Sequence, residues 1–163
     1  MAVIYIVDEN DAVIDVKERS QVKCSDINRT SALWLTNSKG EILLAQRSSD
    51  KYHDPEKWGP AVAGTVEDGE TYEQNIIKEI EEELGITDIK VIEGPKIFCD
   101  KEQSHFVKWF VAELNWELEQ FKVQQAEVKA IRWISKEDLI EEFSANPDSF
   151  IRNADRYINL FCC

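Results

Sequence analysis

A run of acidic residues lies between two glycines in the middle of the chain, in the segment from Gly64 to Ile86. Its glutamates that bear on the argument are Glu70, Glu79, Glu81, Glu82 and Glu83. The last four fall within about one helical turn, where like charges repel by roughly a few tenths of a kcal/mol per pair. A fold tolerates such a cluster either as a solvated helix face or as a cage for a hard cation. The cage accounts for the spacing, whereas the solvated face does not.

The flanking residues predict that this segment forms a helix. Thr71 is a good N-cap residue, and Gln74, three positions later, completes a capping box. Gly85 is a natural stop at the C-terminal end. Aliphatic residues form a stripe along the predicted helix: Ile76, Ile77, Ile80 and Leu84. We therefore expect a helix that buries this stripe against the rest of the fold.

The glutamates form a second stripe beside the aliphatic one. At about 100° per residue, Glu79, Glu82 and Glu83 fall within one arc roughly 100° wide. Ligation by carboxylate oxygens alone suits Mg²⁺ or Mn²⁺ rather than zinc, and no His or Cys stands on this arc. The sequence therefore predicts a site for Mg²⁺ (or Mn²⁺) on one face of the helix.

Written as a pattern, residues 64–86 read Gly-x5-Glu-x7-Lys-Glu-Ile-x-Glu-Glu-x-Gly-Ile. This pattern resembles the Nudix box at every position except Lys78, where the family usually has Arg. The resemblance implies an α/β fold, the Nudix-type α/β/α sandwich with a curved mixed sheet, in a single domain over residues 1–163. It also implies Mg²⁺-dependent hydrolysis of a pyrophosphate bond.

The resemblance further implies roles for individual residues in the box. The implied metal ligands are Glu79, Glu82, Glu83 and, as the family's usual additional ligand, the backbone carbonyl of Ala63. Glu70 would orient this cluster through Lys78. Arg would hold Glu70 with a forked pair of hydrogen bonds, whereas Lys offers a single point contact.

A further glutamate, Glu127, lies six residues before Trp133. Similar Nudix enzymes often place a metal-binding or base glutamate at this distance before a Trp that closes a strand. The alternative is an acidic residue on a surface loop. The general base therefore stays open between Glu83, Glu82 and Glu127.

Two cations, Arg47 and Lys51, follow a predicted strand in an otherwise acidic chain. Both are candidate ligands for diphosphate oxygens, Arg as a fork and Lys as a point charge. The order of an N-terminal hairpin (about residues 3–16), Arg-x3-Lys and then Pro-x2-Trp-Gly at 55–59 resembles the branch of Nudix proteins related to isopentenyl diphosphate isomerase. In that branch the equivalent cations hold diphosphate.

The isomerase itself needs a catalytic Cys and metal-binding His residues near the segment that enters the box. Residues 58–66 contain neither. We therefore expect hydrolysis of a nucleoside diphosphate derivative or a nucleoside di- or triphosphate. A non-catalytic nucleotide-binding module, weakened by Lys78, stays open, and an isoprenoid diphosphate isomerase is disfavoured. The sequence leaves the base, the sugar and the leaving group open.

The resemblance implies a small nucleotide or another small diphosphate as the partner, and the composition is compatible with this. The chain has 163 residues and a net charge of −13, which opposes non-specific binding to nucleic acid. It has no apolar run long enough for a membrane span and no signal peptide in its first residues. Its cysteines lack metal-binding spacing, so we expect free thiols in a reducing cytoplasm. A homodimer stays open.

Alternating and β-rich segments, separated by turn residues, predict strands. The expected strands cover residues 3–7, 12–16, 31–36, 41–46, 61–66, 89–99, 106–114 and 130–134. We expect hairpins at 3–16 and 31–46 and an antiparallel pair at 89–114. Ser135 caps a predicted helix that ends near Phe143. Asn146-Pro147 should open another helix, which runs past Phe161 and docks through an aromatic and aliphatic stripe.

Overall fold

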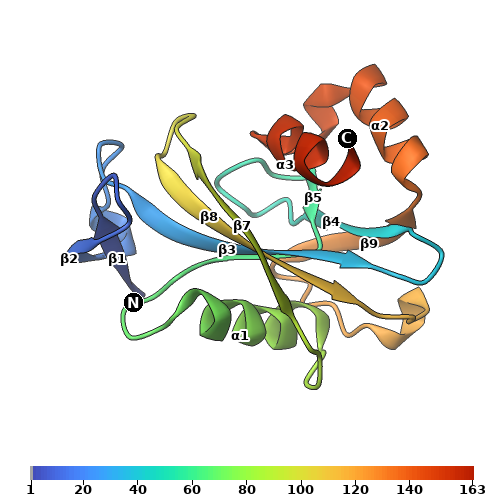
Figure 1. Ribbon diagram of the computed structural model, residues 1–163, viewed down its shortest axis with the longest axis horizontal. Coiled ribbons are helices and arrows are strands. Elements are labelled where there is room, and N and C mark those ends of the chain that lie inside the picture. Colours follow the sequence, from blue (N-terminus) through green and yellow to red (C-terminus); the bar gives the residue numbers. More distant parts are fainter. Residues whose placement is uncertain (1) are drawn as a thin grey trace.

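The computed structural model describes residues 2–163 and places a mixed β-sheet between two helical layers (Figure 1). The strand order is β5-β4-β3-β8-β7, with β6 also paired to β3 and β9 also paired to β4. The strands are β3 (Asn28–Thr36), β4 (Ile42–Arg47), β5 (Trp58–Pro60), β6 (Val62–Thr65), β7 (Ile92–Cys99), β8 (His105–Glu113) and β9 (Val128–Ile134). Strand β3 runs parallel to β8 and antiparallel to β6. The predicted α/β/α architecture is confirmed.

The central strand β3 explains why helices cover both faces of the sheet. Successive side chains of a strand point to opposite faces, and β3 is apolar at each of them. Ala32 and Trp34 enter the core shared with the C-terminal helices, whereas Leu33 and Leu35 enter the core shared with α1. A strand that is buried on both sides needs a helical layer on each side.

Helix α1 (Tyr72–Leu84) forms the layer on one face, shown in green in Figure 1. The predicted capping box is present, with Thr71 and Gln74 exchanging side-chain and backbone hydrogen bonds. The helix ends at Gly85 in the left-handed region, at φ 72°. A side chain there would also meet Lys122, since an added Cβ would lie 2.7 Å from the Lys122 Cβ. Both ends of the helix are therefore where the sequence predicts them.

A buried asparagine on α1 fastens this helix to the sheet. Asn75 is fully buried, and its side-chain amide donates to the Thr65 carbonyl at 3.0 Å and to Glu70 Oε2 at 2.9 Å. Its Oδ1 accepts a hydrogen bond from the buried Ser31 hydroxyl on β3. Three partners on β3, β6 and the turn before α1 therefore fix the rotation of the helix about its axis, in addition to the apolar stripe.

The other face is covered by α2 (Lys136–Ala145), the 3-10 turn η3 (Pro147–Ser149) and α3 (Ala154–Cys162). The prediction that one helix starts at Asn146-Pro147 is wrong, because only a single 3-10 turn forms there. Phe150 then pairs with Trp58 on β5, and the Ile151 N–H donates to the Trp58 carbonyl at 2.9 Å. This pairing keeps the chain extended until α3 begins at Ala154.

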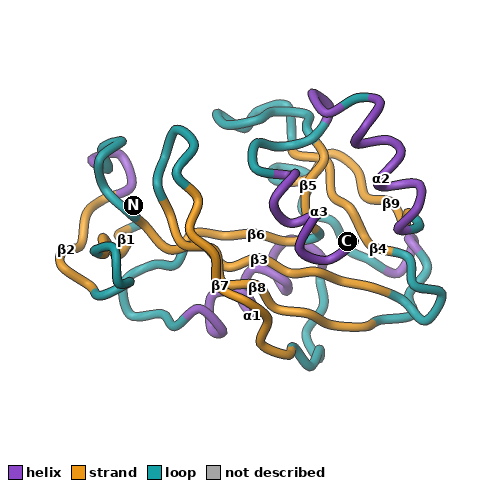
Figure 2. Tube along the Cα trace, turned by 45° about the horizontal axis from the view of Figure 1, so that its top comes forward, coloured by secondary structure: helices purple, strands orange, loops and turns teal. Residues whose placement is uncertain are grey.

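A separate two-stranded sheet, β1 (Val3–Val7) and β2 (Val13–Glu18), lies at one end of the molecule (Figures 1 and 2). The predicted hairpin is confirmed, although its second strand is shifted slightly toward the C-terminus. The hairpin contacts the turn before α1, where the Asp68 N–H donates to the Val3 carbonyl at 2.8 Å. The 3-10 turn η1 (Arg19–Gln21) follows β2 and leads back to β3.

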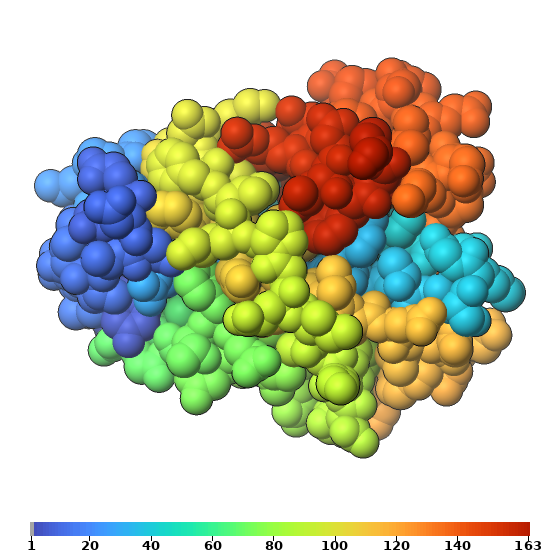
Figure 3. All heavy atoms as spheres, viewed as in Figure 1, coloured from blue at the N-terminus to red at the C-terminus, as the bar shows by residue number. Residues whose placement is uncertain are grey.

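The remaining differences from the predicted elements are at two strand starts and in two short elements. Strand β3 begins at Asn28 rather than Ser31, and β7 begins at Ile92 rather than Ile89. The short edge strand β5 and the 3-10 turn η2 (Leu118–Gln120) were not expected from the pattern. In the space-filling view, the turn near residue 100 lies between the N-terminal hairpin and the C-terminal helices (Figure 3). None of the described helices is long and apolar enough to cross a membrane.

Replacing Asn75 with Ala should lower the free energy of unfolding by about 2–4 kcal/mol. The change removes a hydrogen-bonded buried amide and leaves the Ser31 hydroxyl and the Thr65 carbonyl without their partner. Chemical denaturation of the purified variant measures this loss. The exposed Gln124→Ala serves as a control for loss of an amide, and an Asn75→Ala variant as stable as the native chain would refute the fastening role.

Candidate active site

The predicted carboxylates lie along one face of α1 and border a cleft of about 390 Å³. Glu82 is exposed and Glu79 is half-buried, and both line this cleft. Glu83 is buried and opens instead into an adjoining cavity of about 60 Å³. Ala63, on β6, lines both the cleft and the smaller cavity. The structure therefore brings the box glutamates and Ala63 together at the edge of the sheet.

Glu83 is the most unusual of these groups. Its side chain has no hydrogen bond at Oε2, although that atom is buried. Burial, and then the neighbouring carboxylate of Glu79, raise the pKa of Glu83 to about 8, against the opposing effect of Lys51 and Arg47. Burial and then Glu82 also raise the pKa of Glu79. A desolvated carboxylate with an unpaired oxygen is the group that a bound cation would stabilise most.

Gly64 allows the sheet and the helix to approach each other at this point. A Cβ at Gly64 would lie 2.5 Å from Cγ and 2.7 Å from Cδ of Glu79. Any side chain there would displace the Glu79 carboxylate from the wall of the cleft. Glycine at the first position of the box therefore allows β6 to pass close to α1.

The carboxylates border two adjoining spaces but do not converge on a point. Among residues 2–163, no three His, Cys, Asp or Glu side chains lie close enough together to form a ready metal cage. The donor set still fits a hard cation, since it consists of carboxylate oxygens, one of them buried and unpaired. Binding would require the exposed Glu82 and the half-buried Glu79 to turn toward Glu83.

Backbone hydrogen bonds bring Glu127 to the same cleft from a distant part of the chain. The Gln124 N–H donates to the Glu83 carbonyl at 3.0 Å, and the Glu127 N–H donates to the Gln124 carbonyl at 2.9 Å. The Ser48 N–H in turn donates to the Glu127 carbonyl at 3.0 Å. Glu127 therefore sits between the end of α1 and the loop after β4, and it lines the cleft.

The loop after β4 supplies the two predicted cations. Lys51 forms an ion pair with Glu127 across the cleft. Arg47 donates from Nε to the His53 carbonyl at 2.9 Å and forms no ion pair among the described residues, although Asp54 and Glu83 lie near enough to oppose the lowering of its pKa by burial. Both side chains line the cleft that holds Glu79 and Glu82. A guanidinium that no carboxylate holds in an ion pair is notable in a chain with a net charge of −13.

Lys78 contacts two carboxylates in the turn that leads into α1. Its Nζ donates to Glu67 Oε2 at 2.8 Å and also pairs with Glu70. Burial opposes the charged form of Lys78, but these two hydrogen bonds raise its pKa. Burial likewise opposes ionisation of Glu70, but Lys78, the Glu67 N–H and Asn75 lower its pKa. The predicted Lys78–Glu70 contact is therefore present, and Glu67 is an additional partner that the sequence reasoning missed.

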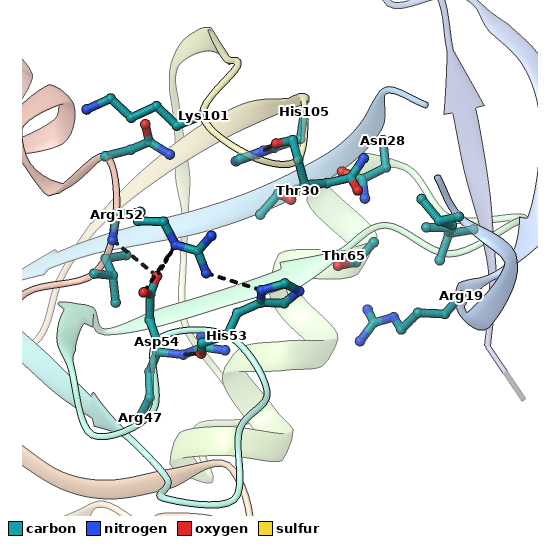
Figure 4. A pocket seen from close by; sticks show the side chains of 15 residues that line it. Arg19, Asn28, Thr30, Arg47, His53, Asp54, Thr65, Lys101, His105 and Arg152 are labelled. Carbon is teal, nitrogen blue, oxygen red and sulfur yellow. Dashed lines mark hydrogen bonds and ion pairs between the residues drawn. The ribbon is translucent and has the colours of Figure 1, made fainter. Parts of the chain in front are cut away.

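A second pocket, of about 400 Å³, adjoins the cleft beside α1 (Figure 4). Arg19, Thr30, Arg47 and Thr65 line both spaces, so the two are neighbours. In Figure 4, Arg19 extends toward the loop that carries His53, and Arg152 lies on the opposite side. Arg152 is paired with Asp54 and Glu102. Arg19 has no ion pair among residues 2–163, which leaves its guanidinium available.

The sequence reasoning missed Arg19 and Arg152 as candidate binding residues. Arg19 follows the N-terminal hairpin, and Arg152 precedes α3, so nothing in the local pattern links either residue to the box. The two histidines, His53 and His105, line the second pocket. Burial lowers the pKa of each of them, and Arg152 adds to this effect at His53. The surroundings of both rings therefore favour the neutral form.

The family model for the NUDIX domain matches residues 27–154. The chain therefore belongs to the Nudix superfamily, and membership supports hydrolysis of phosphoric anhydride bonds. An uncharacterised Nudix hydrolase of Pseudomonas aeruginosa is 30% identical over 142 residues, covering 86% of this chain and 83% of the relative.

Two further relatives have named activities. A prenyl-diphosphate phosphatase of Methanosarcina mazei is 29% identical, and the match covers 88% of this chain and 85% of the relative. An isopentenyl-diphosphate Delta-isomerase of Enterobacter is 25% identical, and the match covers 90% of this chain and 84% of the relative. The solved structure of DR0079 from Deinococcus radiodurans superposes with a TM-score of 0.85 at 20% identity, over 97% of this chain and 98% of that one. This likeness confirms the predicted Nudix-type fold.

Lys78→Arg should retain or raise activity, because a forked guanidinium can hold Glu67 and Glu70 at least as well as an ammonium. Lys78→Ala should lose activity by at least about 10-fold, since Glu70 and Glu67 would then repel each other beside α1. Turnover of a diphosphate substrate under saturating Mg²⁺ measures both effects. Lys90→Ala, at an exposed position on the loop after the box, controls for loss of one positive charge. Full activity in Lys78→Ala would remove this pair from the mechanism.

Proposed function

We propose that the chain is a Mg²⁺-dependent pyrophosphohydrolase that acts on a nucleoside diphosphate derivative or a nucleoside di- or triphosphate. One observation carries the proposal: the buried Glu83 carboxylate, whose Oε2 has no hydrogen bond, lines a small cavity that adjoins the cleft bordered by Glu79, Glu82 and Arg47. This arrangement suits a substrate that brings both a divalent metal and phosphate oxygens to one place.

In this proposal the metal is held by Glu79, Glu82 and Glu83, with the backbone carbonyl of Ala63 and with Glu127 as further ligands. When bound, Mg²⁺ would help to activate water and to neutralise charge on the leaving oxygens. The chain supplies the base from Glu83, Glu82 or Glu127. Glu127 would first have to release Lys51, and the freed ammonium would then be available to the substrate.

The cations place the diphosphate in this mechanism. Arg47 borders both the cleft beside α1 and the second pocket. Its guanidinium can therefore contact phosphate oxygens while the rest of the substrate lies in that pocket. Arg19 reaches the same junction from the opposite side. Lys51 completes the set next to the carboxylates. Lys78 contacts no substrate in this scheme and acts by positioning Glu70 beside α1.

The relative from Methanosarcina mazei motivates a second candidate, the removal of phosphate from prenyl diphosphates. The same metal face and cations would serve this reaction. The second pocket argues against it, because its lining includes Asn28, Gln103 and Asn153 together with charged residues. Such a lining suits a hydrogen-bonding group better than a hydrocarbon chain.

Isomerisation of isoprenoid diphosphates is less well supported. It needs a proton donor and acceptor at carbon, and β5 and β6 contribute neither Cys nor His. Cys99, the last residue of β7, is buried, and burial raises the pKa of its thiol, so it is not held as a reactive thiolate. A non-catalytic nucleotide-binding module would keep the pocket and lack turnover, which a direct assay detects.

Glu83→Gln should lower kcat by at least about 10²-fold, as expected for losing a metal ligand or base. The fold should survive, because the change removes a desolvated charge from that face. Mn²⁺ titration calorimetry should show weaker binding in the variant. Glu81→Gln, on the exposed side of the same helix, is the matched control and should retain activity and metal affinity. Near-native turnover in Glu83→Gln would place the active site elsewhere.

Arg47→Ala should raise KM by roughly 10-fold or more if its charge-assisted contacts contribute about 1.5–3 kcal/mol. An unchanged KM in Arg47→Ala would remove the arginine from substrate binding.

The reaction product separates hydrolysis from isomerisation. Hydrolysis in ¹⁸O-labelled water should place the label on a phosphate product. No double-bond migration should occur when isopentenyl diphosphate is supplied with Mg²⁺. An allylic product from the native chain would overturn the hydrolase assignment.

A further inference from the structure

The loop between β2 and β3 carries Arg19 to the site. It leaves β2 after Glu18, forms the 3-10 turn η1 and joins β3 at Asn28. Arg19 borders both the cleft beside α1 and the second pocket. In Figure 4 its side chain extends from this turn toward the loop that carries His53. The position of its guanidinium therefore depends on how the loop between β2 and β3 is held.

An ion pair closes this loop at its two ends. Lys17 Nζ, on β2, donates to both carboxylate oxygens of Asp26 at 2.9 Å. The two side chains are only 23% and 13% exposed, so this is a part-buried pair with a two-point contact. Asp26 Oδ2 also accepts from the Lys23 N–H at 2.7 Å. Burial opposes ionisation of Asp26, but Lys17 and the Lys23 N–H lower its pKa, so it is held as a carboxylate.

Asp26 is also joined to the turn between β7 and β8. Gln103 Nε2, in that turn, donates to the Asp26 carbonyl at 2.7 Å and to the Lys23 carbonyl at 3.3 Å. Gln103 itself lines the second pocket. Asp26 is therefore the residue at which the loop is fastened both to β2, through Lys17, and to a wall of the pocket, through Gln103.

Arg19 itself is held through its backbone. Its N–H donates to the Ala2 carbonyl at 3.0 Å, and its carbonyl accepts from the Val22 N–H at 3.3 Å. Its side chain is exposed and forms no ion pair within the part of the chain that the structure describes. The loop therefore fixes where the guanidinium starts, while the guanidinium itself is available to a ligand.

Two other cations lie close to Arg19. Burial and then Arg47 lower the pKa of Lys51, and Arg19 adds to this effect. All three side chains border the cleft beside α1. Like charges at short range repel one another, so Arg19 would tend to move away from the other two if the loop were free. Three cations that are kept together favour the binding of an anion between them.

We propose that Asp26, through its ion pair with Lys17, is a positioning residue that holds Arg19 at the junction of the cleft and the second pocket. There Arg19 contacts the phosphate groups of the substrate. This inference rests on the proposed function and adds to it a residue that does not touch the substrate. Without the ion pair, the ends of the loop would separate, and repulsion from Arg47 and Lys51 would carry the guanidinium away from the junction.

The charge of Asp26 gives the test a clear sign. Asp26→Ala removes a negative charge, so long-range electrostatics alone would strengthen the binding of an anion. Loss of the Lys17–Asp26 pair would instead release Arg19 and weaken that binding. Weaker anion binding in Asp26→Ala therefore reports the position of Arg19 rather than the net charge of the chain.

The test measures binding of methylenebisphosphonate, a diphosphate analogue whose bridging carbon resists hydrolysis, by isothermal titration with Mg²⁺ present. The native chain is compared with Asp26→Ala, Arg19→Ala and the double variant. Arg19→Ala should raise Kd by roughly 10-fold or more, as for loss of a charge-assisted contact, and Asp26→Ala by about 5-fold. The double variant should bind no more weakly than Arg19→Ala, because Asp26 acts through Arg19. Lys17→Arg keeps the ion pair and should bind as the native chain does.

Asp11→Ala is the matched control, because it also removes a paired carboxylate from the N-terminal hairpin. Asp11 lies in the turn between β1 and β2, at the end of β2 opposite to Arg19. It accepts from Arg29 Nε at 2.7 Å and from Lys96 Nζ at 2.8 Å. Both Asp→Ala variants should lower Tm, since each leaves part-buried cations without their partner. Only Asp26→Ala should weaken binding of the analogue.

Several outcomes would overturn the inference. They are binding by Asp26→Ala as tight as that of the native chain or tighter, an equal loss in Asp11→Ala, a double variant whose loss is the product of the two single losses, and no binding of the analogue by the native chain.

A turnover assay with nucleotides separates this inference from the proposed function, because the analogue is bound without being cleaved. Asp26→Ala should raise KM and leave kcat unchanged. The expected binding pattern without turnover of any nucleotide would support the positioning of Arg19 and overturn the hydrolase. Turnover together with unchanged binding in Asp26→Ala would support the hydrolase and overturn the positioning role.

Discussion

The burial of a carboxylate in an acidic chain is the constraint on which the rest of the site depends. Glu83 can remain desolvated only because α1 is pressed against the sheet, with its aliphatic stripe beneath it and Asn75 fixing its rotation. If the helix turned or lifted, water would reach Glu83 and its pKa would fall toward the ordinary range. In the proposed function, the packing of α1 is therefore as necessary as the carboxylates themselves. It also explains why Gly64 must lack a side chain.

The charge of the chain bears on the role proposed for the cations. A net charge of −13 would repel a polyphosphate from most of the surface, so the proposed binding depends on local positive groups and on bound metal. Lys51 is neutralised by Glu127, whereas Arg47 and Arg19 keep their charge at the junction of the cleft and the second pocket. This arrangement favours a ligand that reaches the junction with its phosphates.

The sequence predicts local features well and distant juxtapositions poorly. The caps of α1 and the Lys78–Glu70 contact follow from residues close together in the chain, and the structure contains both. The helix predicted from Asn146 fails for the opposite reason. Its cap and proline favour a helix locally, but the pairing of Phe150 with β5 keeps the chain extended. Arg19 could not be predicted, because its place in the site depends on how the N-terminal hairpin docks.

These two kinds of feature also divide the proposed site into two parts. The carboxylates of the Nudix box lie on one helix, and their spacing can be read from the sequence. The second pocket is lined by Arg19 after the N-terminal hairpin, His105 on β8 and Asn153 just before α3, which come together only after the hairpin and the C-terminal segment pack on the sheet. No single stretch of sequence specifies this pocket. In the proposed function, the box therefore accounts for cleavage of a pyrophosphate bond, whereas the substrate depends on how these distant segments pack.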